Sequence, residues 1–225
     1  MHANGQDILH RAYNRLKSID FYSRIGVSKD DGFSPSKSDK AALAYGLALG
    51  GTFNLSKRLD LQVAVAWERG AVISEGDLGT IRTPTETLSI LKRETSLHYT
   101  SFIAMPKYYM GRKGRFFVGL GGFASNPNRR LATALTVSDG TMTRKITQTE
   151  IADQGWDFGV MFYGGVSFRC LRRPIEIAAN LRQSFVETPS KVSGSFFILT
   201  SLNLTVSMPV YVFHQGSRKS RQSLK

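Results

Sequence analysis

The chain has 225 residues, a hydrophobic fraction of 41% and a formal net charge of +13. This length allows one domain or two small ones, and no apolar run reaches the roughly 20 residues that a membrane helix needs. A single cysteine, Cys170, excludes an intrachain disulfide. A membrane barrel stays compatible with this composition, because only alternate residues of its strands face lipid.

The N-terminal segment has a pattern of its own. Apolar residues from Ile8 to Leu16 share one helical face, which predicts a short helix at about residues 8–17. The stretch from Met1 to Asp7 is polar and lacks the apolar centre of a signal peptide. Because a barrel must be exported, we expect a signal sequence to have been removed upstream of this segment.

From residue 18 onward the hydrophobic period is two, the period of β-strands. The clearest segment is 41–53, where large apolar residues such as Leu43 and Leu47 alternate with alanine and glycine. A soluble sandwich would instead carry polar residues on its outward face. The pattern predicts a narrow barrel with bulky residues toward lipid and small residues in a tight lumen. Comparable alternation predicts eight strands at about residues 18–27, 41–53, 59–72, 94–110, 115–125, 155–168, 174–186 and 195–213.

Two of these strands need a closer assignment of their faces. In the segment 94–110 we expect the lipid-facing side to consist of Leu97, Tyr99, Ile103 and Met105. In the last strand Tyr211 and Phe213 have the parity of the polar face. A β-bulge at Pro209 would turn them outward, since proline cannot donate to the strand ladder.

The connections between the predicted strands alternate in length. Short turns are expected near residues 54–58, 111–114 and 169–173, and longer links near 28–40, 70–93 and 126–154, with a shorter one near 188–194. Outer-membrane barrels have short periplasmic turns and longer external loops. We therefore predict a closed antiparallel transmembrane β-barrel of about eight strands over residues 18–213. Residues 1–17 form a periplasmic N-terminal segment and residues 214–225 a basic tail, so both termini are periplasmic.

The positive charge falls on the turn side of this topology. Charges in the external loops and in the strands each sum to zero, so the turns and termini carry the whole excess of 13. Such a rim suits anionic lipid headgroups or an acidic periplasmic partner, and it argues against nucleic acid. The alternative is a solvated rim without a dedicated partner. The predicted periplasmic basic rim consists of Lys57, Arg58, Arg112, Lys113, Arg115, Arg169, Arg172 and Arg173.

Charged side chains within membrane strands are costly unless they pair inside the barrel. The polar faces of the strands predict a lumen charge network of Arg24, Glu68, Asp157, Glu176 and Arg182. Such a network would plug a narrow barrel, whereas an ion or proton path would need continuous water. Aromatic residues near strand ends predict girdles at the membrane interfaces, formed by Trp67, Tyr99, Tyr108, Tyr109, Trp156 and Phe213.

Several motifs, taken in order, resemble a known family. Residues 102–111 read FIAMPKYYMG and residues 114–122 read GRFFVGLGG, which is an apolar strand ending in Lys-Tyr-Tyr, a glycine-basic turn and an aromatic-Val-Gly-x-Gly strand. LSKRLDL at 55–61, DFG at 157–159 and GGV at 164–166 fit the same order. From about residue 21 to 213 the chain resembles the PorT-like outer-membrane β-barrel family of Bacteroidetes-type bacteria, although Pro106 lies later in its strand than in that pattern.

The resemblance implies an outer-membrane location and no enzymatic activity, and one branch of the family takes part in protein secretion. The leading hypothesis is a non-enzymatic barrel that serves as a structural or accessory subunit of an envelope or secretion assembly. Its expected partners are outer-membrane lipids and other envelope proteins.

We predict no catalytic, cofactor or metal site, because the histidines and Cys170 lack ligand spacing and no phosphate-binding fingerprint is present. Two alternatives remain. One is an outer-membrane lipid-modifying enzyme that uses His98 with a serine and an acid. The other is a soluble lipocalin-like barrel, which the pattern of residues 41–53 disfavours.

Overall fold

The computed structural model describes residues 15–30, 39–76, 78–111, 115–151, 155–170, 173–185, 188–190, 195–197 and 199–212. Almost all of these residues lie in β-strands, and the predicted helix at 8–17 falls largely outside them. Leu16 and Lys17 belong to the first strand, which corrects the end of that predicted helix. No helix in the described ranges is long and apolar enough to cross a membrane.

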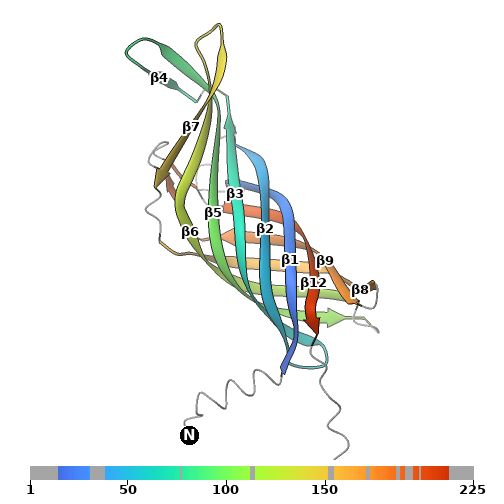
Figure 1. Cartoon of the computed structure of the whole chain (residues 1–225). Coiled ribbons are helices and arrows are strands. Elements are labelled where there is room, and N and C mark those ends of the chain that lie inside the picture. Colours follow the sequence, from blue (N-terminus) through green and yellow to red (C-terminus); the bar gives the residue numbers. More distant parts are fainter. Residues whose placement is uncertain are drawn as a thin grey trace, which may run out of the picture.

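The strands follow one another almost without interruption (Figure 1). Their bounds are β1 (Leu16–Asp30), β2 (Asp39–Asn54), β3 (Leu59–Glu75), β4 (Thr80–Arg82), β5 (Thr87–Met110), β6 (Phe116–Ser138), β7 (Thr143–Ile151), β8 (Asp157–Cys170), β9 (Arg173–Ser184), β10 (Thr188–Ser190), β11 (Ser195–Phe197) and β12 (Leu199–Val212).

Among the described residues, eight strands close into an antiparallel ring in the order β1-β2-β3-β5-β6-β8-β9-β12, and the ring returns to β1. The first and last strands seal it over a long ladder, from Ser18 opposite Val212 to Asp30 opposite Leu199. Closure gives every wall strand two hydrogen-bonded neighbours, so the wall has no open edge. The predicted fold class, a closed antiparallel barrel, is confirmed.

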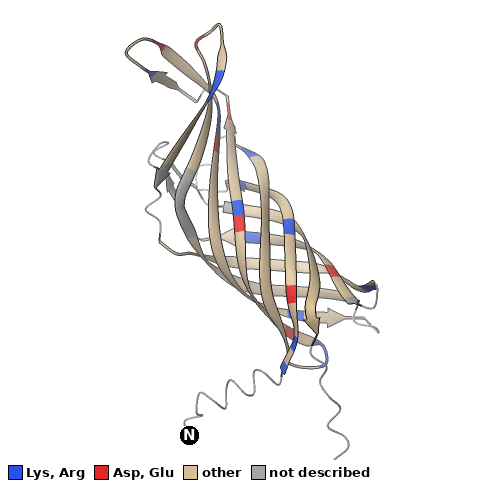
Figure 2. Cartoon of the chain, in the orientation of Figure 1, with Lys and Arg blue, Asp and Glu red and all other residues tan. Residues whose placement is uncertain are grey.

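The outward and inward faces of β2 confirm the inverted pattern. Leu43, Leu47 and Leu49 are 52%, 49% and 56% exposed on the outside, whereas Ala44 and Ala48 are buried in the lumen. Strands β8, β9 and β12 repeat the arrangement with apolar residues outward. Most of the wall ribbon is uncharged, and the charged positions along it are few and separate (Figure 2). An apolar exterior around a largely polar interior is the arrangement of a membrane-spanning barrel.

The face assignment of β5 was wrong. Tyr99, Ile103 and Met105 are buried inside the barrel, and Phe102 is half-exposed on the outside. Both faces of this strand are apolar, so alternation alone does not distinguish them. A register shift between Ile90 and Lys92 in the ladder with β6 adds one residue to β5, so the buried parity of the strand changes there, before Leu97 and Tyr99.

Large side chains on one wall of the lumen face small ones on the other. Ile103, Met105, Phe117 and Phe123 project inward from β5 and β6, and they form one core with the alanines of β2 and β3. Gly159 on β8 shows how tight this packing is, because an added Cβ would lie 2.4 Å from Cζ of Phe123. The narrow lumen is therefore filled by side chains in its middle.

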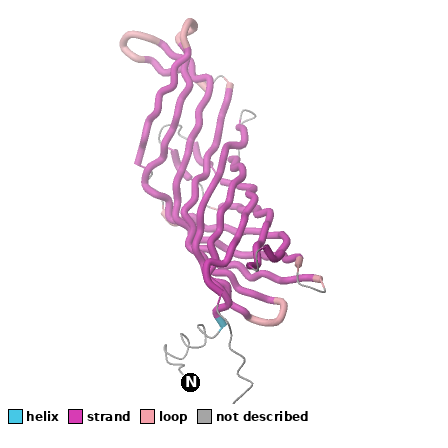
Figure 3. The backbone as a smooth tube through the Cα atoms, turned by 45° about the vertical axis from the view of Figure 1, so that its right-hand side comes forward, coloured by secondary structure: helices cyan, strands magenta, loops and turns pink. Residues whose placement is uncertain are grey.

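Two of the predicted long links are extensions of the barrel wall (Figure 3). β5 and β6 stay paired as far as Ser89 opposite Ser138, while β4 and β7 add to their outer sides. The extension has a small core of its own, consisting of Leu88, Ile90, Leu135 and Val137 with Leu78, Ile81 and Ile146 packed against it. The links near 70–93 and 126–154 are thus largely strands rather than loops.

The turn between β6 and β7 is organised by one carboxylate. Oδ1 of Asp139 accepts hydrogen bonds from the backbone N–H groups of Thr141 and Met142, both at 2.8 Å, and Gly140 has a φ of +96°. These donors lower the pKa of Asp139 from its ordinary 3.8 to about 2. The turn closes the outermost hairpin of the extension.

We expect the turn to keep its structure well below the ordinary pKa of aspartate. Because the pKa of Asp139 is lowered in the folded turn, its charged carboxylate stabilises the turn fully above pH 3.8. This stabilisation is lost as the pH falls through about 2. An NMR titration of the Asp139 carboxyl measures this directly. Asp139→Asn, which keeps an acceptor without the charge, should remove the transition. A carboxyl that titrates at 3.8 in the wild type would contradict the assignment.

A β-bulge near the end of β12 changes the face of the barrel on which the following aromatic residue lies. Asp20 of β1 pairs with Pro209 and Ile19 pairs with Tyr211, so Val210 is the extra residue. Tyr211 consequently faces outward and is 57% exposed. The bulge predicted at Pro209 is present, whereas Phe213 lies outside the described residues.

Candidate functional site

The first functional feature is a buried ion cluster in the lumen. Glu68 of β3 forms ion pairs with Arg24 of β1 and Arg182 of β9, and all three side chains are at most 7% exposed. Arg182 also donates to Oγ of Ser125 at 2.6 Å and to Oγ of Ser101 at 3.2 Å. Its guanidinium lies over the rings of Tyr99 and Phe123. The cluster ties β1, β3, β5, β6 and β9 together across the lumen.

The other two residues of the predicted network lie elsewhere. Asp157 accepts a hydrogen bond from Ser184 near the loop end of β8 and β9. Glu176 lies toward the turn end of β9, where Lys107 and Tyr109 donate to its carboxylate at 2.6 and 2.7 Å. The structure therefore brings three of the five predicted residues together and places Glu176 in a second layer.

Lys107 is the residue of this second layer that the sequence reading missed. Its side chain is 1% exposed, and its Nζ lies 5.1 to 5.9 Å from the ring centroids of Phe117, Tyr163 and Tyr22. Cation–π contacts and the pair with Glu176 compensate its burial. The correct parity of β5 would have revealed it, because Lys107 shares the inward face with Ser101 and Met105.

The region between the two charged layers is closed. The space among Tyr22, Arg24, Gln62, Met105 and Tyr163 has a volume of only about 10 Å³. This is scarcely enough for one water molecule. A gap of this size cannot hold the continuous column of water that an ion or proton path needs.

The turn end of the barrel opens into a large cavity, which we call the vestibule. It has a volume of about 1170 Å³. Near its inner end Oδ2 of Asp20 accepts hydrogen bonds from the hydroxyls of Thr52, Tyr22 and Ser18, at 2.5, 3.1 and 3.1 Å. Its lining consists of Lys17, Ser18, Asp20, Thr52, Asn54, Lys57, Asp60, Tyr109, Arg115, Ser167, Phe168, Arg169, Pro174, Glu176, Ser207, Pro209 and Val212.

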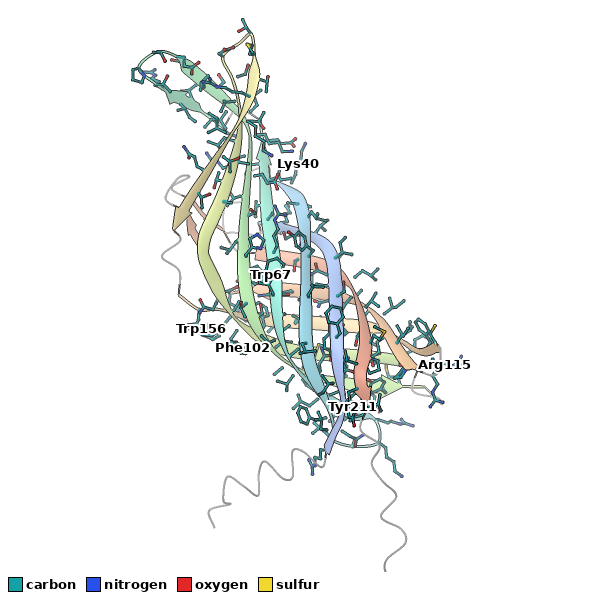
Figure 4. All side chains as sticks on the ribbon, in the orientation of Figure 1. Lys40, Trp67, Phe102, Arg115, Trp156 and Tyr211 are labelled. Carbon is teal, nitrogen blue, oxygen red and sulfur yellow. The ribbon has the colours of Figure 1, made fainter. Side chains whose placement is uncertain are left out.

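The predicted basic rim is divided by the structure. Lys57, Arg115 and Arg169 line the vestibule, whereas the exposed side chain of Arg58 does not. Arg115 lies at the turn end of the wall (Figure 4). The structure does not describe Arg112, Lys113 and Arg172, nor the side chain of Arg173.

The aromatic girdle prediction needs correction. Trp67, Tyr108 and Trp156 face outward and are 43–46% exposed, and Figure 4 shows Trp67 and Trp156 on the wall. Tyr99 is buried beside Arg182, and Tyr109 lies in the vestibule against Glu176. These two interior tyrosines do not belong to a girdle, since both have the inward parity of β5.

His98 is on the outside of the barrel, not in the lumen as its predicted parity implied. Its ring stacks on Trp67 with the centroids 5.1 Å apart. Nδ1 of His98 has no hydrogen-bond partner within the described part of the chain. Ser96 is buried and donates to the backbone oxygen of Ala132. The arrangement of a Ser-His-acid triad is therefore not formed around His98 by the described residues.

Metal ligands do not converge in the described ranges, where no group of three or more His, Cys, Asp or Glu residues could hold an ion. The free Cys170 is exposed at the turn end of β8.

Comparisons with known proteins give structural neighbours alone. No family model matches the chain, and no curated protein matches it. The chain is similar to Neisserial surface protein A, with 12% identity and a TM-score of 0.43 over 86% of this chain and 98% of that one. Ail of Yersinia pestis, in complex with the heparin analogue sucrose octasulfate, has 14% identity and a TM-score of 0.37 over 86% and 97%. OprG from Pseudomonas aeruginosa has 12% identity and a TM-score of 0.39 over 87% and 95%.

Proposed function

We propose that the chain is a non-enzymatic integral barrel of the bacterial outer membrane, with both termini on the periplasmic side. The observation that carries the proposal is the apolar exterior, on which Leu49, Leu120, Phe158, Leu204 and similar residues are half-exposed around the whole ring. Water would penalise such a surface, whereas lipid accommodates it. The closed ring also pairs the backbone groups of the wall, as a bilayer requires.

The orientation follows from the connections. Turns join β2 to β3, β5 to β6 and β8 to β9 at the end where β1 begins and β12 finishes (Figure 1). The extension of β4 to β7 projects from the opposite end (Figure 3). Short periplasmic turns and long external connections are typical of outer-membrane barrels, so we assign the vestibule to the periplasmic side.

The role we favour is that of a structural or accessory subunit of an envelope or protein-secretion assembly, as the PorT-like resemblance implies. The filled lumen supports this role, because the Glu68 cluster and the apolar layer beneath it leave no passage for solutes. Function then resides in the surfaces: the extension outside, the lipid-facing wall and the basic vestibule. Outer-membrane lipids and other envelope proteins are the proposed partners.

Envelope fractionation and heat-modifiability test the proposal. The exported chain should partition with the outer membrane, and its detergent extract should migrate differently on gels with and without boiling, because closed barrels resist unfolding until heated. Boiling-dependent migration together with outer-membrane partition supports the proposal. A protein that partitions with the soluble fraction and shows no shift contradicts it.

We further expect the purified barrel to conduct almost no ions in planar bilayers. The interior of an eight-stranded barrel is filled by side chains, and the space between its two charged layers is only about 10 Å³. Single-channel recording measures this, with a porin of known conductance as the positive control. Stable stepwise conductance by the wild-type chain would show that the lumen opens.

A further inference from the structure

The vestibule has a charge pattern that defines what could enter it. Its three carboxylates are compensated by the protein itself: Asp60 by Lys17 at 2.7 Å, Glu176 by Lys107 at 2.6 Å, and Asp20 by three hydroxyl donors. These carboxylates therefore need no cation or hydrogen-bond donor from a ligand. The acceptor groups of the lining are thus already occupied by donors of the protein.

The cations nearer the opening are in the opposite situation. Lys57, Arg115 and Arg169 line the cavity with exposed side chains, and none forms an ion pair with a carboxylate in the described ranges. Arg115 immediately precedes β6, and Arg169 lies in the adjacent strand β8, whereas Lys57 comes from the β2–β3 turn, with β5 between β3 and β6 in the ring. A ligand that satisfies all three must be anionic and must carry more than one negative charge.

The location of the cavity decides between kinds of anion. It lies inside the ring of strands, on the polar side of the wall, while the apolar surface that meets lipid tails lies on the outside. A lipid would have to leave the bilayer to place its headgroup there. The volume of about 1170 Å³ exceeds that of typical small-molecule sites, which favours a segment of polypeptide over a single inorganic anion.

We propose that the vestibule binds an acidic peptide segment of a periplasmic protein, with Lys57, Arg115 and Arg169 as the contacting cations. This inference rests on the proposed function, since it names the chemistry of the partner that an accessory barrel would hold. Acidic side chains of the segment pair with the two arginines of neighbouring strands and with Lys57 of the β2–β3 turn. Arginine suits this task because its planar fork binds carboxylates in a bidentate manner.

Binding of a fluorescein-labelled hexaglutamate peptide to the folded barrel in neutral detergent micelles tests the proposal by fluorescence anisotropy. The wild type should bind the peptide with an affinity that falls as salt is added. The triple variant Lys57→Gln, Arg115→Gln, Arg169→Gln should bind about tenfold more weakly, because each exposed ion pair contributes modestly.

A matched variant separates the vestibule from the overall positive charge. Lys29→Gln, Arg58→Gln, Lys145→Gln removes the same charge from exposed positions that do not line the cavity, and it should bind hexaglutamate like the wild type. If the two triple variants lost affinity for hexaglutamate equally, the peptide would be binding through the overall positive charge of the chain, and the proposal would be overturned. Displacement of the peptide by equimolar inorganic phosphate or by phosphatidylglycerol added to the micelles would also overturn it.

Heat-modifiability of every variant is recorded in parallel. A barrel that shows the boiling-dependent shift but does not bind hexaglutamate refutes the vestibule site and leaves the proposed membrane function intact. A wild-type chain that forms no heat-modifiable barrel refutes the proposed function itself.

Discussion

Replacing Glu68 with glutamine is expected to destabilise the barrel by about 3–5 kcal/mol, the usual cost of breaking a buried ion pair from one side. Glu68 is the carboxylate that both Arg24 and Arg182 contact, and all three are buried in the lumen. Without it two guanidinium groups would face each other in a site that excludes bulk water. Urea unfolding in lipid vesicles, followed by the fluorescence of Trp67 and Trp156, measures the change.

Two variants give this prediction its controls. Glu68→Gln combined with Arg24→Met removes one of the two uncompensated charges, so the double variant should be more stable than Glu68→Gln alone. Glu75→Gln affects a glutamate that also pairs with two cations, Lys40 and Lys92, but at the exposed loop end. Solvent screening should make its effect small. If Glu68→Gln were no more harmful than Glu75→Gln, the cluster would not stabilise the barrel.

The second large effect is expected on the outer wall, where Phe162→Arg should destabilise the barrel by about 2–4 kcal/mol if the residue lies near the middle of a bilayer. Phe162 projects outward from the centre of β8 and is 51% exposed. On a soluble protein the same substitution would be nearly neutral, because arginine at an exposed site is well solvated. The substitution therefore distinguishes lipid from water around the wall.

Phe168→Arg is the matched control, since Phe168 has the outward parity of β8 and is 43% exposed at the turn-end rim, where it also borders the vestibule. It lies about 20 Å along the strand from Phe162, at about 3.3 Å per residue, which places it near the membrane interface in a tilted strand. Its cost should be about 0–1 kcal/mol. Phe162→Leu, which stays apolar, controls for the loss of the ring. Equal unfolding free energies for the two arginine variants would contradict a membrane around this wall.

The architecture and the orientation of several faces are local properties of the sequence. Leu43, Leu47 and Leu49 point outward and the intervening alanines inward because successive side chains of a strand alternate, whatever its neighbours are. The same rule placed Arg24, Glu68 and Arg182 on inward faces. Closure then follows because lipid cannot satisfy open strand edges.

The tertiary structure decided which residues meet. Register is set between strands, so sequence alone could not tell that Glu68 contacts Arg182 whereas Glu176 contacts Lys107 in a separate layer. Nor could it identify the register shift between Ile90 and Lys92, where the buried parity of β5 changes from that of Leu88 and Ile90 to that of Tyr99.

The extension and the vestibule are tertiary features for the same reason. β6 pairs with β8 over residues 116–125 and with β7 over residues 130–138. Because of this change of partner, a segment that was predicted to be a loop is part of the extended wall. The vestibule gathers Lys57, Arg115 and Arg169 from distant segments. The alternation of a strand is determined by its own residues, but the partners of a side chain in a barrel are determined by the pairing of strands far apart in the chain.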